Sequence, residues 1–182
     1  MGDARIAREP HGKRKPPYEP HIGTTKPQGA NMANSMVKID VHFIFHIKTT
    51  SVPMAPGDLP QIFAYIGGIL KENGSIPIIV GGIPDHVHTL ASLPTSMTIS
   101  ELARTAKANS SRWIKTLSPA YSKFAWQNGY GAFSVSPSLL DKTILYIKNQ
   151  ERHHRTKSFQ DEYKAFLEAY QIPYDEKYLF ND

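Results

Sequence analysis

The stretch IPIIVGGIPDHVHTLASL, residues 76–93, indicates two short apolar strands that lie on either side of a tight connection. A Gly-Gly break and an Ile-Pro-Asp turn at residues 81–85 separate the two apolar runs. Because alternate residues of a strand share a face, His86 and His88 are expected on one side and Val87 on the other, in the core. A strand that presents two histidines on the same face calls for a chemical explanation.

Elements before and after this pair extend the pattern. Residues 37–45 alternate apolar and polar side chains, as in a half-buried strand, and residues 58–73 carry apolar residues at helical spacing. A capping box, Thr98 with Glu101, begins a second helix that extends to Leu117. Residues 125–135 then form a fourth strand.

The resulting order β-α-β-β-α-β predicts an α+β fold of the ferredoxin-like type, an antiparallel sheet with helices on one face. Two C-terminal helices follow. The first spans residues 138–150 and is capped by Ser138 with Asp141, and the second is an acidic helix at residues 158–170. The other face of the sheet is expected to be open for a partner, as in many nucleic-acid-binding modules, although a fold alone assigns no function.

Composition divides the chain into two parts. Residues 1–35 are rich in Pro, Gly, Lys and Arg without apolar periodicity, so a flexible basic N-terminal arm is predicted there, and residues 36–182 form one domain. The chain has no cysteine, which excludes disulfides and thiolate zinc sites. It also lacks a transmembrane stretch or signal peptide, so a soluble, cytoplasmic protein is expected.

Positive charge is concentrated in residues 99–157, where ten Lys and Arg stand against three Asp and Glu. Within the second helix a basic stripe recurs at i, i+3, i+7 and i+11, with one further arginine beside it. The stripe consists of Arg104, Lys107, Ser111, Arg112 and Lys115. Such a stripe suits a phosphate backbone; the alternative is a solvated helix face with no ligand.

Two histidines at this spacing can hold a divalent metal if a third ligand arrives from elsewhere; otherwise His86 and His88 are ordinary hydrogen-bonded surface residues. In the helix at 138–150, Tyr146 and Gln150 are neighbours one turn apart at the edge of the core. The phenol could attack an external electrophile, and the amide oxygen could be the missing ligand. The alternative is a packing tyrosine beside a solvated glutamine.

Four stretches, PDHVHTL, KANSSRW, WQNGYGAFSVS and YIKNQERHH, occur in this order. Together they resemble the single-tyrosine HUH transposases of the IS200 insertion-sequence group, which includes relatives associated with repetitive extragenic palindromes, over about residues 37–180. The resemblance implies that His86, His88 and Gln150 bind Mg²⁺ or Mn²⁺ and that Tyr146 is the nucleophile. No role is implied for His153 or His154.

The same resemblance implies an enzyme that cuts and rejoins single-stranded DNA next to hairpins through a 5′-phosphotyrosine, without a nucleotide cofactor or a membrane. It also implies a homodimer in which the tyrosine helix of one subunit can act in the other. Three alternatives remain: a catalytically silent nucleic-acid-binding module of the same fold, a structural or metal-storing domain, and a replication initiator or relaxase. Many relaxases place the tyrosine before the histidines, which disfavours the last of these.

Overall fold

The computed structural model describes residues 36–180. The flexible basic arm predicted for residues 1–35 lies outside the described residues. The strands are β1 (Asp40–His46), β2 (Ile76–Ile83), β3 (His86–Ser92) and β4 (Gly131–Val135). The helices are α1 (Leu59–Glu72), α2 (Ile99–Leu117), α3 (Leu140–Lys148), α4 (Gln150–His153), α5 (Phe159–Ala169) and α6 (Glu176–Leu179). In the described part of the chain, no helix has the length and apolar character needed to cross a membrane.

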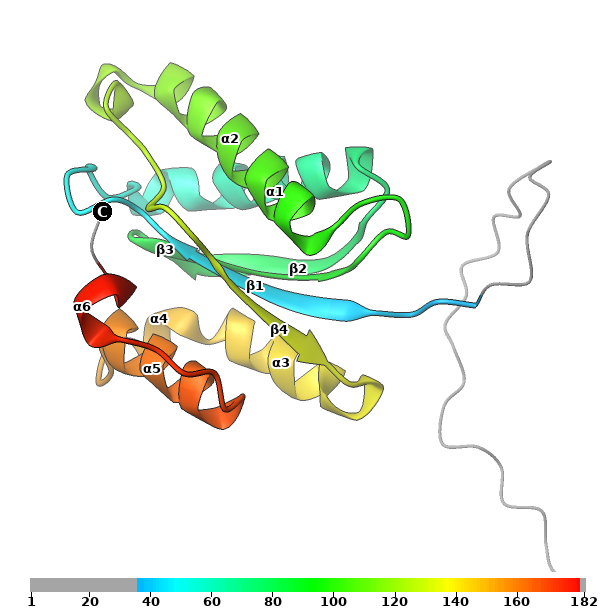
Figure 1. Ribbon diagram of the computed structural model, residues 1–182. Helices are drawn as coiled ribbons and strands as arrows, with labels where there is room; N and C mark the ends of the chain where they lie inside the picture. Colours follow the sequence, from blue (N-terminus) through cyan, green and yellow to red (C-terminus); the bar gives the residue numbers. More distant parts are fainter. Residues whose placement is uncertain (1–35, 181–182) are drawn as a thin grey trace, which may run out of the picture. The chain divides into compact units, whose positions relative to one another are not determined.

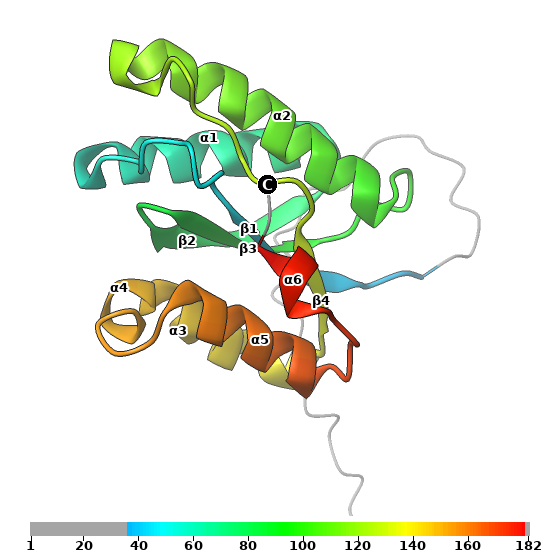
Figure 2. The same cartoon turned by 60° about the vertical axis from the view of Figure 1, so that its left-hand side comes forward.

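The four strands form one antiparallel sheet in the order β2-β3-β1-β4, which confirms the predicted α+β, ferredoxin-like arrangement. Helices α1 and α2 cover one face, and α3, α4 and α5 cover the opposite face (Figures 1 and 2). The expectation of an open second face is therefore wrong. The C-terminal helices occupy that face, because they carry apolar side chains that need cover of their own.

The face under α1 and α2 holds the main apolar core. Phe43 and Val87 from the sheet pack there with Ile62, Ile66 and Leu102 from the helices. The predicted inward direction of Val87 is confirmed, since its side chain is fully buried. The capping box of Thr98 and Glu101 also forms as predicted at the start of α2.

The second face changes the interpretation of β1, whose first six residues are all buried. Ile44 packs with Phe133 and Leu167 beneath α5, and His42 is buried beside them. The prediction of a half-buried strand is therefore wrong for β1. A polar residue that alternates with apolar ones signals solvent only if nothing else covers its face, and here α5 does.

The region of the predicted third helix also differs from expectation. A short 3-10 turn at Pro137–Leu139 precedes α3, and Ser138 pairs with the hydroxyl of Ser136 instead of capping the helix. The helix ends at Lys148, and α4 begins at Gln150 after a break at Asn149. One helix over 138–150 is thus two, and the fourth strand is shorter than its predicted span.

Two glycines allow neighbouring elements to lie close to β2. They do not break the strand as predicted, because β2 continues through both. Gly82 has φ +151°, and a Cβ there would stand 2.2 Å from the carbonyl oxygen of His86. At Gly81 a Cβ would stand 2.8 Å from Ile147 Cγ2 in α3. A side chain at either position would therefore displace a neighbouring element of the structure.

Candidate active site

His86 and His88 lie on the same face of β3, as predicted, and both are completely buried under the C-terminal helices. The Nδ1 atom of His86 lies 2.7 Å from Oδ1 of Asp85, in the turn before the strand. The Nδ1 atom of His88 lies 2.9 Å from Nε2 of His42 on the adjacent strand β1. These contacts orient both rings so that their Nε2 atoms face the helices.

Tyr146 and Gln150 reach the two histidines from the helices that cover this face of the sheet. Gln150 is buried at the first position of α4, and its Oε1 lies 3.2 Å from His86 Nε2. Tyr146, near the end of α3, packs its ring edgewise against His88, with centroids 5.9 Å apart. One chain therefore brings together Tyr146, His86, His88 and Gln150.

A buried carboxylate that we did not predict stands at the centre of the cluster. Glu162, in α5, is 1% exposed, and its Oε1 accepts hydrogen bonds from the Tyr146 hydroxyl and, at 3.0 Å, from Gln150 Nε2. A signal for it exists in the sequence. An acidic residue at position 162 falls on the apolar face of its own helix, three residues after Phe159 and four before Phe166.

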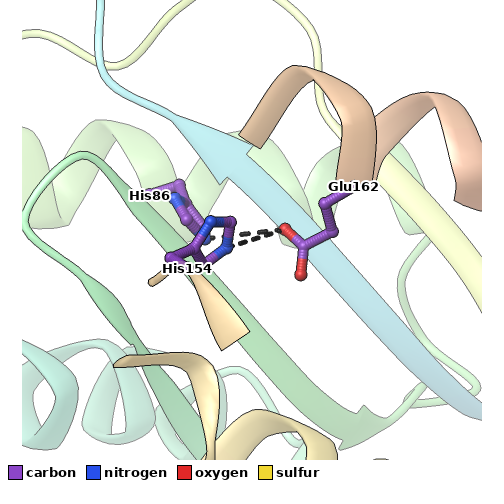
Figure 3. Close-up of side chains that lie close together, drawn as sticks. All are labelled: His86, His154 and Glu162. Atoms are coloured by element: carbon purple, nitrogen blue, oxygen red, sulfur yellow. Dashed lines mark ion pairs between the residues drawn. The ribbon is translucent and has the colours of Figure 1, made fainter. Parts of the chain in front are cut away.

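His154, for which no role was predicted, also belongs to the cluster. Its Nε2 lies 3.0 Å from Gln150 Oε1 and 3.3 Å from Glu162 Oε2. Its Nδ1 lies 2.8 Å from the backbone carbonyl of Lys157, which holds the ring in place. The side chains of His86, His154 and Glu162 converge on one point from β3, the end of α4 and α5 (Figure 3).

Burial and charge set the protonation states of these groups. Burial lowers the pKa of His88 to about 4, so its imidazole is neutral near pH 7. Burial alone would raise the pKa of Glu162, but His88 and the hydrogen bonds from Tyr146 and Gln150 hold it below its usual range. Burial and the contact with Glu162 raise the pKa of Tyr146 above its usual value. The tyrosine is therefore a protonated phenol that needs activation.

The cluster fits a divalent metal ion. Three buried side-chain atoms in the described part of the chain, His88 Nε2, His153 Nε2 and Glu162 Oε2, have no hydrogen-bond partner. One ligand atom each from His86, His154 and Glu162 lies within 4.8 Å of the others. Imidazole nitrogens and a carboxylate oxygen that face one point are a donor set for a divalent cation.

Two cavities give access to the tyrosine. One, of about 270 Å³, is lined by His42, Thr143 and Tyr146 among others. The second, of about 220 Å³, is lined by Tyr146, Glu162, His153 and Lys157 among others. A substrate can therefore approach the phenol beside a lysine and a histidine, which are suitable partners for a phosphate.

The predicted basic stripe lies on α2, on the opposite face of the sheet from the tyrosine. Arg104 and Arg112 are exposed, as is Lys115 at the end of the helix. The Lys107 ammonium instead donates to the backbone carbonyls of Gln127 and Gly129. Ser111 donates to the carbonyl of Phe124 at 3.3 Å. The structure does not bring this stripe to the site, and its contact with DNA stays a prediction.

Two adjoining cavities link the stripe with the side of the site. One, of about 410 Å³, is lined by Arg104 and Lys107 together with residues 125–130. The other, of about 210 Å³, shares residues 127–130 with it and extends to His46 and Phe159. His46 in turn lies 3.7 Å from Asp85, the partner of His86.

The family described as "Transposase IS200 like" matches residues 35–150, well over half of the sequence. The chain belongs to the IS200-like transposase family. Its match ends at Gln150, so His154 and Glu162 lie beyond it. Membership implies a DNA-cleaving enzyme and confirms the family named from the sequence motifs.

Two of the solved structures that share the fold are described as transposases. A proposed transposase from Deinococcus radiodurans R1 has a TM-score of 0.52 at 20% identity, over 67% of this chain and 98% of its own. A REP-associated tyrosine transposase bound to a REP hairpin has a TM-score of 0.51 at 13% identity, over 69% of this chain and 74% of its own. No curated protein matches the sequence.

Proposed function

We propose that this transposase cuts and rejoins single-stranded DNA next to hairpins by transesterification at Tyr146. One observation carries the proposal: the Tyr146 hydroxyl donates a hydrogen bond to the carboxylate that faces His86, His88 and His154. A nucleophile and a metal-ligand cluster thus meet in one pocket. The solved relative bound to a REP hairpin supports a hairpin-bearing substrate.

In the proposed step, the phenolic oxygen of Tyr146 forms a bond to the scissile phosphorus as the bond from phosphorus to the 3′ oxygen breaks. The phenol loses its proton, the 3′ oxygen takes one up, and a 5′-phosphotyrosine remains. Glu162 Oε1 already accepts the phenolic hydrogen, so it orients the hydroxyl and lies where that proton must go. Attack by a 3′-hydroxyl on the phosphotyrosine reverses the step and rejoins the strand.

His86, His88 and Gln150 would hold the divalent ion, Mg²⁺ or Mn²⁺, at the centre of the cluster. When bound, such an ion polarises the phosphate and stabilises the charge that develops in the transition state. Asp85 keeps the His86 ring turned toward this centre, since its carboxylate lies 2.7 Å from Nδ1. Lys157 and His153, which line the cavity beside Tyr146, would orient the phosphate.

The homodimer belongs to the proposal as well, and its tyrosine helices can act within their own subunit or in the partner. One chain carries every group named above, so catalysis in cis needs no second subunit. Mixing inactive Tyr146→Phe and His88→Ala chains distinguishes the two arrangements. Recovery of adduct in the mixture would establish action in trans, whereas a mixture as inactive as its parts would establish action in cis.

Covalent capture tests the reaction itself. The full chain is incubated with a pool of hairpin-bearing single-stranded DNA and Mn²⁺ or Mg²⁺, and denaturation-resistant protein-DNA adducts are measured. We expect adducts that disappear with Tyr146→Phe or with a chelator. They should persist with Tyr65→Phe, because Tyr65 lies in α1 and stacks on Trp113 of α2, away from the site.

An adduct that survives Tyr146→Phe would mean that another residue is the nucleophile. Binding without an adduct on every hairpin tried would favour the second candidate, a catalytically silent single-stranded nucleic-acid-binding module of the same fold. The exposed arginines of α2 are the observation that supports this candidate.

A further inference from the structure

We propose that Glu162 and His154, which lie beyond the family match, are direct ligands of the catalytic metal together with His86. The inference rests on the proposed function, because it concerns the metal of that same site. It assigns the C-terminal segment a chemical role: α5 and the residue that follows α4 complete the coordination sphere begun on β3. It rests on the tautomers of His86 and His154, on the distances between the converging side-chain atoms, and on the burial of Glu162.

The hydrogen bonds to the outer ring nitrogens define which atoms carry lone pairs. The carboxylate of Asp85 can only accept, so His86 Nδ1 donates to it at 2.7 Å. The backbone carbonyl of Lys157 likewise accepts from His154 Nδ1 at 2.8 Å. In a neutral imidazole, which carries a single N–H, these contacts place the lone pair of His86 and of His154 on Nε2.

The atoms opposite these lone pairs are also acceptors. Gln150 donates through Nε2 to Glu162, and this hydrogen bond turns the Gln150 Oε1 atom toward the two rings. Gln150 Oε1 lies 3.2 Å from His86 Nε2 and 3.0 Å from His154 Nε2. Glu162 Oε2 lies 3.7 Å from His86 Nε2 and 3.3 Å from His154 Nε2. Four acceptor atoms thus converge with no hydrogen between them, and a cation is the partner that satisfies all four.

The distances and burial argue against a simple ion pair. A charge-assisted hydrogen bond between an imidazole nitrogen and a carboxylate oxygen spans about 2.7–2.9 Å, shorter than every contact of Oε2 with these rings. Glu162 Oε2 has no hydrogen-bond partner, although the residue is 1% exposed. An unpaired buried carboxylate oxygen is costly, so its place among imidazoles is explained by an ion that it binds.

The two carboxylate oxygens of Glu162 have different partners. Oε1 accepts from the Tyr146 hydroxyl and from Gln150, which leaves Oε2 for the metal. The carboxylate therefore connects the nucleophile with the ion. Removal of the carboxylate charge should therefore lower the metal affinity.

Titration of the full-length protein with Mn²⁺, followed by the electron paramagnetic resonance signal of free Mn²⁺, measures affinity without DNA or turnover. We expect Glu162→Gln and His154→Gln each to weaken Mn²⁺ binding at least about tenfold, because loss of a ligand should cost no less than loss of an outer-shell partner, and we expect His88→Ala to weaken it as well. Glu151→Gln, which removes the same charge from an exposed position on α4, should bind as the wild type does.

Thermal melts without metal confirm that each variant is folded. Glu162→Asp provides a second test, because it keeps the charge but withdraws the oxygens by one methylene, and we expect an intermediate affinity. Glu162→Gln that binds Mn²⁺ as tightly as the wild type, while His88→Ala loses it, would overturn the inference and leave the proposed function intact. A wild-type protein that binds Mn²⁺ through Glu162 and forms no adduct would support the inference and contradict the proposed function.

Discussion

The two faces of the sheet bury their residues for different reasons. Beneath α1 and α2, Val41, Phe43 and Val87 contribute to a core of apolar side chains. Beneath α3, α4 and α5, the same strands bury His42 and His88 together with a glutamate from the covering helix. Adjacent residues of one strand thus belong to two environments of opposite character.

The first face contributes mainly to the stability of the fold, and the second face to the reaction. Apolar burial contributes about 25 cal/mol per Å² removed from water, so the first face stabilises the fold. Buried imidazoles and a carboxylate cost desolvation free energy, which only precise partners offset. We attribute the buried polar groups of the second face to the reaction. Substitutions on the two faces should therefore affect stability and reaction rate separately.

Neighbouring residues of β3 should give opposite phenotypes. We expect His88→Ala to slow adduct formation about a thousandfold, because a metal site supplies several kcal/mol of transition-state stabilisation. Val87→Ala should instead lower the free energy of unfolding by about 2 kcal/mol through the cavity it leaves, with little change in rate. Adduct kinetics and urea denaturation measure both quantities. Equal losses of rate in the two variants would show that the faces are not separable.

Alanine substitutions at Gly81 in β2 and Gly67 in α1 should also have opposite effects. A Cβ at Gly81 would meet Ile147 Cγ2 at 2.8 Å and the Ile147 carbonyl oxygen at 3.1 Å, so Gly81→Ala must shift Ile147, the residue that follows Tyr146 in α3. We expect adduct formation to fall about a hundredfold, as small misplacements of a nucleophile do. Gly67, in α1, has only Val80 Cγ2 at 3.8 Å, and Gly67→Ala should raise the free energy of unfolding by about 0.5–1 kcal/mol. An unchanged rate in Gly81→Ala would mean that α3 adjusts without moving its tyrosine.

The sequence predicts the first face far better than the second. Period-two and helical spacing identify the strands and helices, and alternation places His86 and His88 together. Local pattern cannot reveal that the chain returns over the polar face of β1, since that depends on contacts such as Tyr146 with Glu162, sixteen residues apart. Local periodicity does not reveal the break at Asn149 either.

Acid should lower the free energy of unfolding of the metal-free protein through protonation of His88. The pKa of His88 is about 4 when folded and about 6.5 when unfolded, so below pH 6.5 the unfolded state binds more protons. Stability is then full above pH 6.5 and declines as the pH falls toward 4, by roughly 2 kcal/mol at pH 5. Urea denaturation at pH 7.5 and 5 measures the change. Val87→Ala should retain this slope, whereas an equal slope in His88→Asn would assign it to other groups.

The smallest expected effect concerns the exposed side of α2. If the basic stripe contacts a phosphate backbone, Arg104→Ala should weaken binding of single-stranded hairpin DNA about fivefold and reduce the salt dependence of affinity by about one phosphate contact. Adduct formation at saturating DNA should not change, because Arg104 lies on the face opposite Tyr146. Lys71→Ala, which removes an exposed charge at the end of α1, is the matched control. Equal salt slopes in the two variants would make the stripe a solvated helix face, and the DNA path would then have to follow the cavity at Lys157 and His153 instead.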